Sequence, residues 1–95
     1  MKKLFSVLVV LIAVSFGYSQ SAKKYFENGI AKATLLDYKG AIADYSEAIK
    51  KSPEFSGAYY QRGRSEIEIE NYGKAIIDFN KAIELDPEYA LAYYN

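Results

Sequence analysis

The sequence predicts an all-α fold built from repeated pairs of helices, and three observations lead to this prediction. The chain matches itself at an offset of 34 residues, as repeat proteins made of one supersecondary unit do. Apolar residues recur at helical spacing in both copies, and the apolar–polar alternation of half-buried strands is absent. With 95 residues, 51% of them hydrophobic, the chain has the size and composition of one small folded domain.

Residues 1–19 have the order of a secretory signal peptide. A basic Lys2-Lys3 start precedes the uncharged run Leu4–Phe16, and small residues then fit cleavage after Ser19. The apolar run is short for a membrane span, which needs about 20 residues. We therefore expect a cleaved signal, with an uncleaved anchor or a buried core helix as the alternatives. Cleavage predicts export to the bacterial periplasm or the cell exterior, without stable membrane insertion afterwards.

The 34-residue unit occupies residues 22–55, is repeated at residues 56–89, and begins a third time at residues 90–95. Ten of its 34 positions are identical in the first two copies. The matches are Tyr25 with Tyr59, Gly29 with Gly63, Tyr38 with Tyr72, Ala41-Ile42 with Ala75-Ile76, Asp44 with Asp78, Ala48-Ile49 with Ala82-Ile83, and Pro53-Glu54 with Pro87-Glu88.

Each unit is predicted to hold two helices with a short break between them. The first helix of the second unit is expected from about Glu54 to Ile69, because Ser52-Pro53-Glu54 suits a helix start. Breaks are expected just before Asp37 and Asn71, which can cap the second helices. The second helices carry apolar residues three and four positions apart. These are Tyr38, Ala41, Ile42, Tyr45, Ala48 and Ile49 in unit one, and Tyr72, Ala75, Ile76, Phe79, Ala82 and Ile83 in unit two.

Gly29 and Gly63 fall at one register inside the first helix of each unit. A glycine within a helix costs about 1 kcal/mol relative to alanine. Its recurrence predicts a close contact between helices at which no side chain fits.

On these residues the sequence resembles the tetratricopeptide repeat family. The family pattern is met by Tyr25, Gly29, Tyr38, Ala41, Tyr45, Ala48 and Pro53, and again by Tyr59, Gly63, Tyr72, Ala75, Phe79, Ala82 and Pro87. The chain departs from the pattern at three registers. These are Asn28 and Arg62 in place of a large apolar residue, Lys32 and Glu66 in place of Tyr, and Leu36 and Glu70 in place of Gly.

The resemblance implies a right-handed superhelical solenoid of antiparallel helix pairs, whose first helices line a concave, partner-binding face. By family position the groove would comprise Phe26, Glu27, Ile30, Tyr60, Gln61, Arg64, Ile67 and Glu68. Members that grip a C-terminal carboxylate use Lys and Asn where this chain has Phe26 and Ile30. The resemblance therefore favours an apolar or aromatic groove over that clamp.

Several candidate residues have two interpretations. Three aromatic residues share one register of the repeat: Phe26, Tyr60 and Tyr94. They either form an aromatic strip that binds a ligand or pack against the adjacent unit. Arg62 and Arg64 hold an acidic partner, or, as is commoner, are solvated or paired with Glu66 and Glu68. Three glutamates, Glu66, Glu68 and Glu70, do not share one helical face, so they do not predict a metal site.

Composition excludes several classes of function. The chain has no Cys and no His, and Lys plus Arg equals Asp plus Glu at 12 each. No cofactor loop, metal site, catalytic arrangement or nucleic-acid footprint is predicted. We expect a binding module with a protein or peptide partner, or alternatively the extracytoplasmic front of a longer sensor or receptor. Because arrays of this kind need about three units, self-association through the open end after Ile83 is also expected.

Overall fold

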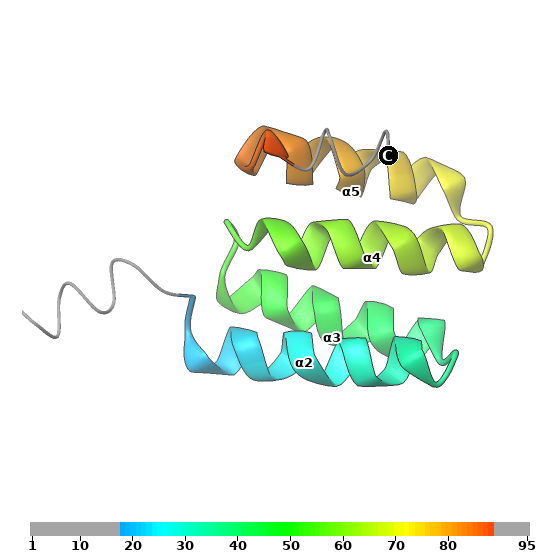
Figure 1. The fold of residues 1–95 in the computed structure, drawn as a ribbon, viewed down its shortest axis with the longest axis horizontal. Coiled ribbons are helices and arrows are strands. Elements are labelled where there is room, and N and C mark those ends of the chain that lie inside the picture. The colour runs from blue at the N-terminus through cyan, green and yellow to red at the C-terminus, as the bar shows by residue number, and fades with distance from the viewer. Residues whose placement is uncertain (1–17, 89–95) are drawn as a thin grey trace, which may run out of the picture.

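A computed structural model describes residues 18–88, which form four helices and contain no strand. The helices, shown in Figure 1, are α2 (Gln20–Thr34), α3 (Tyr38–Lys51), α4 (Ser56–Glu68) and α5 (Tyr72–Leu85). The all-α prediction is confirmed. The predicted signal peptide lies outside the described residues except for Tyr18 and Ser19, and the predicted third unit at residues 90–95 lies wholly outside them.

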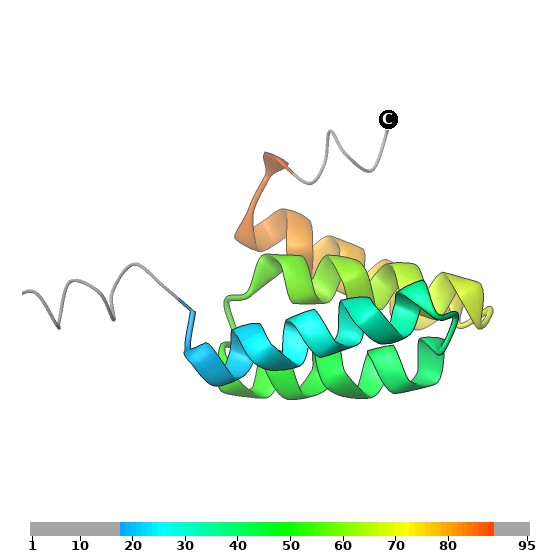
Figure 2. The same cartoon turned by 60° about the horizontal axis from the view of Figure 1, so that its bottom comes forward.

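The helices pair in chain order, α2 with α3 and α4 with α5, and α3 packs on α4 to join the two pairs. Figure 2 shows the successive helices running in alternating directions. The helices α2 and α4 also touch each other over a smaller area, and α3 packs against both of them. This arrangement places the first helices of the two pairs side by side.

The helix starts differ in how their backbone N–H groups are capped. Ser19 and Asp37 cap α2 and α3, accepting hydrogen bonds from the backbone N–H of Ala22 and Gly40. The prediction that Asp37 caps its helix is thus confirmed. Asn71 is the N-cap residue of α5 as predicted, but its side chain does not bond to the helix backbone.

The first helix of the second unit begins at Ser56, two residues after the predicted start at about Glu54, so Ser52-Pro53-Glu54 precedes the helix and does not start it. Ser52 is the C-cap of α3, and α4 begins only at Ser56. The Ser52 hydroxyl instead accepts a hydrogen bond of 3.2 Å from the backbone N–H of Ser19. Pro53 lies in the turn, because a proline fits a turn as well as the first position of a helix.

Both helix-to-helix turns within the pairs place a non-glycine residue in the left-handed region, Leu36 at φ 65° and Glu70 at φ 64°. Each turn closes with two hydrogen bonds of the Schellman type. Asp37 N donates to Lys32 O at 2.8 Å and Leu36 N to Ala33 O at 2.9 Å, with the same pattern at Asn71 and Glu70. Leu36 and Glu70 therefore stand at positions whose backbone conformation favours glycine, which is the residue that the family pattern has there.

The core confirms the predicted close contact at the glycines. A Cβ built on Gly29 would lie 2.6 Å from Cε1 of Tyr45, and one on Gly63 would lie 2.8 Å from Cε1 of Phe79. The alanines of the repeat are fully or almost fully buried around these rings. Each pair is therefore held by an aromatic ring of its second helix against the backbone of its first.

The outer side of α5 exposes Tyr72, Ile76 and Ile77, with 57%, 56% and 68% of their surface accessible. Their counterparts Tyr38 and Ile42 on α3 are only half-buried, since α4 packs beside them. The expected self-association through this end stays a prediction. Within residues 18–88 no helix is long and apolar enough to cross a membrane.

Candidate functional site

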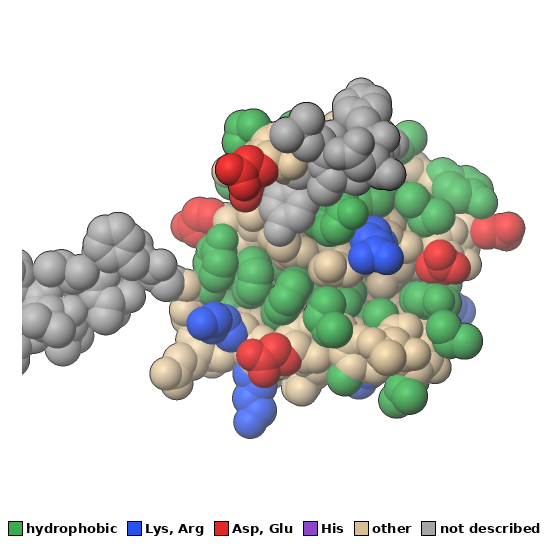
Figure 3. Space-filling view, viewed as in Figure 1, with side chains coloured by type: hydrophobic (Ala, Val, Ile, Leu, Met, Phe, Trp, Pro, Cys, Tyr) green, Lys and Arg blue, Asp and Glu red, His purple; other side chains and the backbone are tan. Residues whose placement is uncertain are grey.

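The candidate site is a groove between α2 and α4, with α3 at its floor. Its cavity measures about 410 Å³. Figure 3 shows apolar side chains gathered in a band across one face of the molecule, with charged side chains at its edges. The groove is lined by Ile30, Ala33, Thr34, Tyr38, Tyr45, Gln61, Arg64, Ser65 and Glu68.

The structure brings four of the eight sequence-predicted groove residues to this cavity: Ile30 from α2, and Gln61, Arg64 and Glu68 from α4. The sequence reasoning missed the five other lining residues. Tyr38 and Tyr45 come from α3, whose apolar stripe the sequence pattern assigns to the core. The signal that could have found them is their register, because this stripe faces both first helices.

The other four predicted residues do not line the cavity. Phe26 packs on Phe55 and Tyr45, with ring centroids 4.7 Å and 5.8 Å away. Tyr60 lies 5.8 Å from the ring of Phe79 in the same way. The structure thus places Phe26 and Tyr60 in packing contacts, while Tyr94 lies outside the described residues.

Glu27 and Ile67 are exposed on α2 and α4 outside the groove's lining. They lie on the helices that flank the groove but do not face its cavity. A partner long enough to extend beyond the cavity would be needed to reach them.

Tyr45 is the largest fully buried side chain among the described residues. Its ring fills the space left by Gly29, and its hydroxyl has no hydrogen-bond partner in the described part of the chain. Burial raises the pKa of this phenol, and the nearby Arg64 charge partly opposes the rise. The hydroxyl is therefore a protonated donor at neutral pH.

Arg64 is exposed and lies over the ring of Tyr60, with Cζ 5.9 Å from the ring centroid. Within residues 18–88 it forms no ion pair. Glu68, one helical turn further along α4, is exposed as well. The α4 wall thus offers a cation and an anion to a ligand, while Ile30, Ala33 and Tyr38 offer apolar surface.

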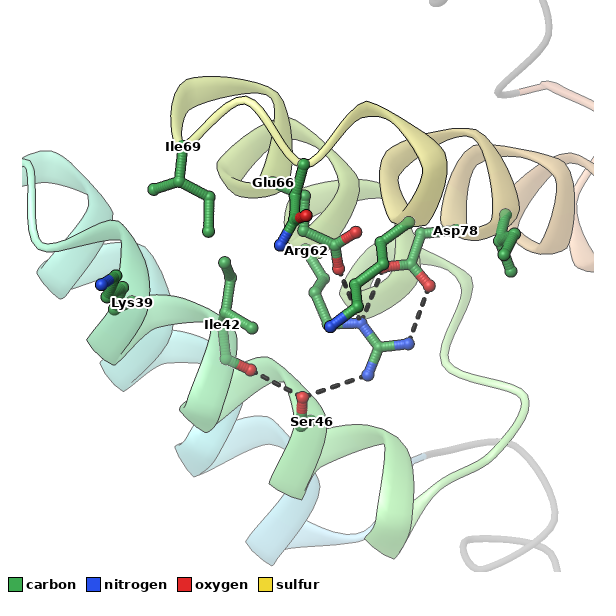
Figure 4. Close-up of a pocket in the computed structure, with 10 residues that line it drawn as sticks. Lys39, Ile42, Ser46, Arg62, Glu66, Ile69 and Asp78 are labelled. Atoms are coloured by element: carbon green, nitrogen blue, oxygen red, sulfur yellow. Dashed lines mark hydrogen bonds and ion pairs between the residues drawn. The ribbon is translucent and has the colours of Figure 1, made fainter.

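A second hollow of about 480 Å³ lies among α3, α4 and α5, and Arg62 is at its centre. As Figure 4 shows, Arg62 donates two hydrogen bonds to Asp78, each 2.7 Å long, and a third of 3.1 Å to the Ser46 hydroxyl. Arg62 pairs with Glu66, at 3.5 Å, as one of the two interpretations predicted, but its main partner is Asp78, which the sequence did not predict. The packing of α5 on α4 brings the Asp78 carboxylate to 2.7 Å from the Arg62 guanidinium, closer than the carboxyl group of Glu66 on α4 at 3.5 Å.

Glu66 is buried beside this pair, 3% exposed, with one carboxylate oxygen 3.5 Å from Nε of Arg62. Burial first, and then the hydrogen bond and charge of Asp78, raise the pKa of Glu66 to about 8. At neutral pH Glu66 is therefore largely protonated, and it can donate its proton to Asp78.

Arg62, Asp78 and Ser46 of the second hollow thus bond to one another. One guanidinium faces one carboxylate and one carboxylic acid, so the buried charges balance. The groove between α2 and α4 differs, since its buried hydroxyl and its exposed cation have no such partners. For this reason the groove is the stronger candidate for ligand binding.

Known proteins support the same architecture. A family model described as a tetratricopeptide repeat matches residues 56–89. The TPR2B domain of yeast Sti1, solved in complex with pHsp70, superposes with a TM-score of 0.75 at 35% identity, over 79% of this chain and 60% of that one. The TPR2AB domain of yeast Sti1, in complex with pHSP90, gives 0.71 at 29% identity, over 90% of this chain and 33% of that one.

None of the curated proteins matches the chain significantly. The chain spans less than two thirds of both solved domains, at 60% and 33% of their lengths. The matched residues 56–89 include the Gly63–Phe79 contact that holds the second pair together. The chain therefore belongs to the tetratricopeptide repeat family.

Proposed function

We propose that this protein is an exported interaction module that binds a peptide, or a segment of a partner protein, in the groove between α2 and α4. The groove itself is the main support for the proposal. It combines apolar surface from Ile30 and Tyr38 with two exposed charges, Arg64 and Glu68, in an open cavity of about 410 Å³. Clefts with apolar walls and a few polar groups are the usual form of binding sites.

The two solved Sti1 domains support a protein or peptide as the ligand class, since both are described as complexes, with pHsp70 and pHSP90. They do not specify the partner of this chain. Phe26 and Ile30 stand where carboxylate-gripping family members carry Lys and Asn. We therefore expect a partner sequence different from theirs.

Binding in the groove can be tested by selecting random displayed peptides on the folded protein. The variant Gln61→Ala/Arg64→Ala removes two groove side chains, and Lys74→Ala/Asn80→Ala, on exposed positions of α5, is the matched control. Enriched peptides should bind the wild type and the control but lose affinity for the groove variant. Equal binding to all three proteins, or no enrichment at all, would rule out this function.

Export is proposed from the basic start and the apolar run of residues 1–19. The intact mass of the protein isolated from its own cells tests it. A mature chain that begins at Gln20 is the expected result. A product that retains residues 1–19 in the cell interior would contradict export.

A further inference from the structure

Tyr18 and Ser19 come before the first repeat unit, yet both make specific contacts with the folded domain. Ser19 is the N-cap residue of α2. Its hydroxyl accepts a 3.0 Å hydrogen bond from the backbone N–H of Ala22, and its carbonyl accepts another of 3.0 Å from the N–H of Lys23. The first turn of α2 therefore depends on Ser19 for two of its hydrogen bonds.

The same two residues join the start of α2 to the turn between α3 and α4, beside which α2 begins in Figure 1. The backbone N–H of Ser19 donates to the hydroxyl of Ser52, a residue that is only 8% exposed. The ring of Tyr18 lies flat on that of Phe55, with centroids 4.1 Å apart and an angle of 4° between the planes. Phe55 belongs to the core and precedes α4 directly. The contacts thus hold α2 against the junction of the two helix pairs.

Loss of Tyr18 and Ser19 would weaken the domain in three ways. The first turn of α2 and the hydroxyl of Ser52 would lose their hydrogen bonds to Ser19. The ring of Phe55 would lose the aromatic ring that stacks on it. A chain that began at Gln20 would also place its ammonium group at the positive end of the α2 dipole, where the first turn has no acidic residue to offset it.

The signal pattern permits cleavage at either of two peptide bonds. Cleavage sites of this kind have small residues one and three positions before the cut. Gly17 and Ser19 meet this condition for a cut after Ser19, and Ser15 and Gly17 meet it for a cut after Gly17. The Gln20 start stated for the export test follows from the first pair alone. The contacts of Tyr18 and Ser19 with the domain favour the second site.

We propose that the signal peptidase cuts between Gly17 and Tyr18, so that Tyr18 and Ser19 are the first two residues of the mature domain. The proposal rests on the proposed export and specifies where the chain is processed. The step is a hydrolysis, in which water is consumed and the bond between the carbonyl carbon of Gly17 and the nitrogen of Tyr18 breaks. The leader leaves with a carboxylate on Gly17, and the mature chain keeps a free amine on Tyr18, outside α2.

The intact mass of the mature protein from its own cells locates the cut. The expected product begins at Tyr18 and is heavier than a chain from Gln20 by one tyrosine and one serine residue. A product that begins at Gln20 would overturn this inference and leave export in place. An uncleaved product would overturn it too, and its location inside or outside the cell decides whether export falls with it.

Two matched variants of the whole precursor test which small residues the peptidase reads. Ser15→Gln enlarges the residue three positions before the proposed cut and should slow processing after Gly17. Ser19→Gln enlarges only the residue before the alternative cut and should still yield a chain that begins at Tyr18. The uncut fraction and the product masses measure both effects. Blocked processing in Ser19→Gln, with normal processing in Ser15→Gln, would place the cut after Ser19 and overturn the proposal.

Thermal unfolding compares the two possible mature chains, each released from a leader that leaves no extra residue. The chain from Gln20 should melt at least about 5 °C lower than the chain from Tyr18, or fail to fold, because it lacks a helix cap and a ring contact. Within the longer chain, Tyr18→Ala should lower the melting temperature. Tyr72→Ala, at a position on α5 that is 57% exposed, is the matched control and should change it less. Equal melting temperatures for the two chains would overturn the proposal, because Tyr18 and Ser19 would then add nothing to the domain.

Discussion

In the first helix pair Asp44 of α3 is held by Lys32, whereas in the second pair its counterpart Asp78 is held by Arg62, one helical turn earlier on the preceding helix. The Lys32–Asp44 distance is 2.9 Å, and the lysine side chain is 45% exposed. Arg62 binds Asp78 through two 2.7 Å bonds, with side chains 22% and 4% exposed. The aspartate at this register is thus paired with an exposed lysine in the first repeat and with a largely buried arginine in the second.

The difference has a consequence for the neighbouring register. Lys32 of the first pair corresponds to Glu66 of the second. Because Arg62 already supplies the cation for Asp78, Glu66 adds a second carboxyl group to the cluster and stays neutral by keeping its proton. The two repeats therefore preserve charge balance by different means, and in the second repeat the balance depends on the proton that Glu66 holds.

The largest expected effect comes from breaking the buried pair. Arg62→Met leaves Asp78 buried without its cation, which should cost roughly 3–5 kcal/mol of unfolding free energy. Lys32→Met in the first pair should change stability little, since Lys32 is exposed and solvent replaces it at Asp44. Urea unfolding of both variants measures the contrast. Equal midpoints for the two variants would mean that burial of the pair does not matter.

The second largest expected effect is the dependence of stability on pH, which arises from Glu66 in the second repeat. The pKa of Glu66 is raised to about 8 in the fold, so the folded state holds a proton that the unfolded state releases. Stability should therefore be fully present below the ordinary glutamate pKa, fall as pH rises from there to about 8, and level off above it. The slope is at most about 1.4 kcal/mol per pH unit for one proton.

Glu66→Gln keeps the shape of the side chain and removes its proton, so the fall in stability with pH should disappear. Asp78 and Arg62 face Glu66 most closely, and Lys74 lies near enough to lower its pKa slightly. Melting temperatures of the wild type and Glu66→Gln between about pH 5 and pH 9 compare the two. A slope that survives in Glu66→Gln would have to come from another group.

The glycines test whether the two pairs pack alike. Gly29→Ala and Gly63→Ala should each cost about 1–3 kcal/mol, because the new methyl group meets the ring of Tyr45 or Phe79. Gly73→Ala meets nothing within 4 Å and should stabilise α5 by roughly 0.4–1 kcal/mol. Denaturant unfolding of the three single variants gives the comparison. A gain in stability for Gly29→Ala would refute the close contact.

Much of this fold could be predicted from the sequence, because the repeat shows itself in the spacing of nearby apolar residues and glycines. The registers of Gly29 and Gly63 predicted a close contact between helices, and the structure shows that the rings of Tyr45 and Phe79 make it. The start of α4 was misplaced because Ser52-Pro53 also satisfies the end of α3, where Ser52 bonds to Ser19. That bond links residues 33 positions apart, and no local pattern encodes it.

The site could be predicted only in part for a related reason. Of the residues that family positions assign to the groove, Ile30, Gln61, Arg64 and Glu68 line one cavity. They gave no role to Tyr45, whose ring belongs to the core and whose hydroxyl reaches the groove floor. The Arg62–Asp78 pair was missed as well. Its signal was the charged residue at a register that is apolar in the family, but choosing Asp78 as the partner requires the packing of α5.

The smallest expected contrast concerns the caps of the second helices. Asp37 accepts a 3.0 Å hydrogen bond from Gly40 N, whereas the Asn71 side chain makes no capping bond. Asp37→Ala should therefore cost about 1 kcal/mol, and Asn71→Ala only a fraction of that, although both side chains are exposed at equivalent registers. Chemical denaturation of the two variants measures the difference. Equal losses would show that Asn71 caps α5 in solution, and the second pair would then share the first pair's means of starting a helix.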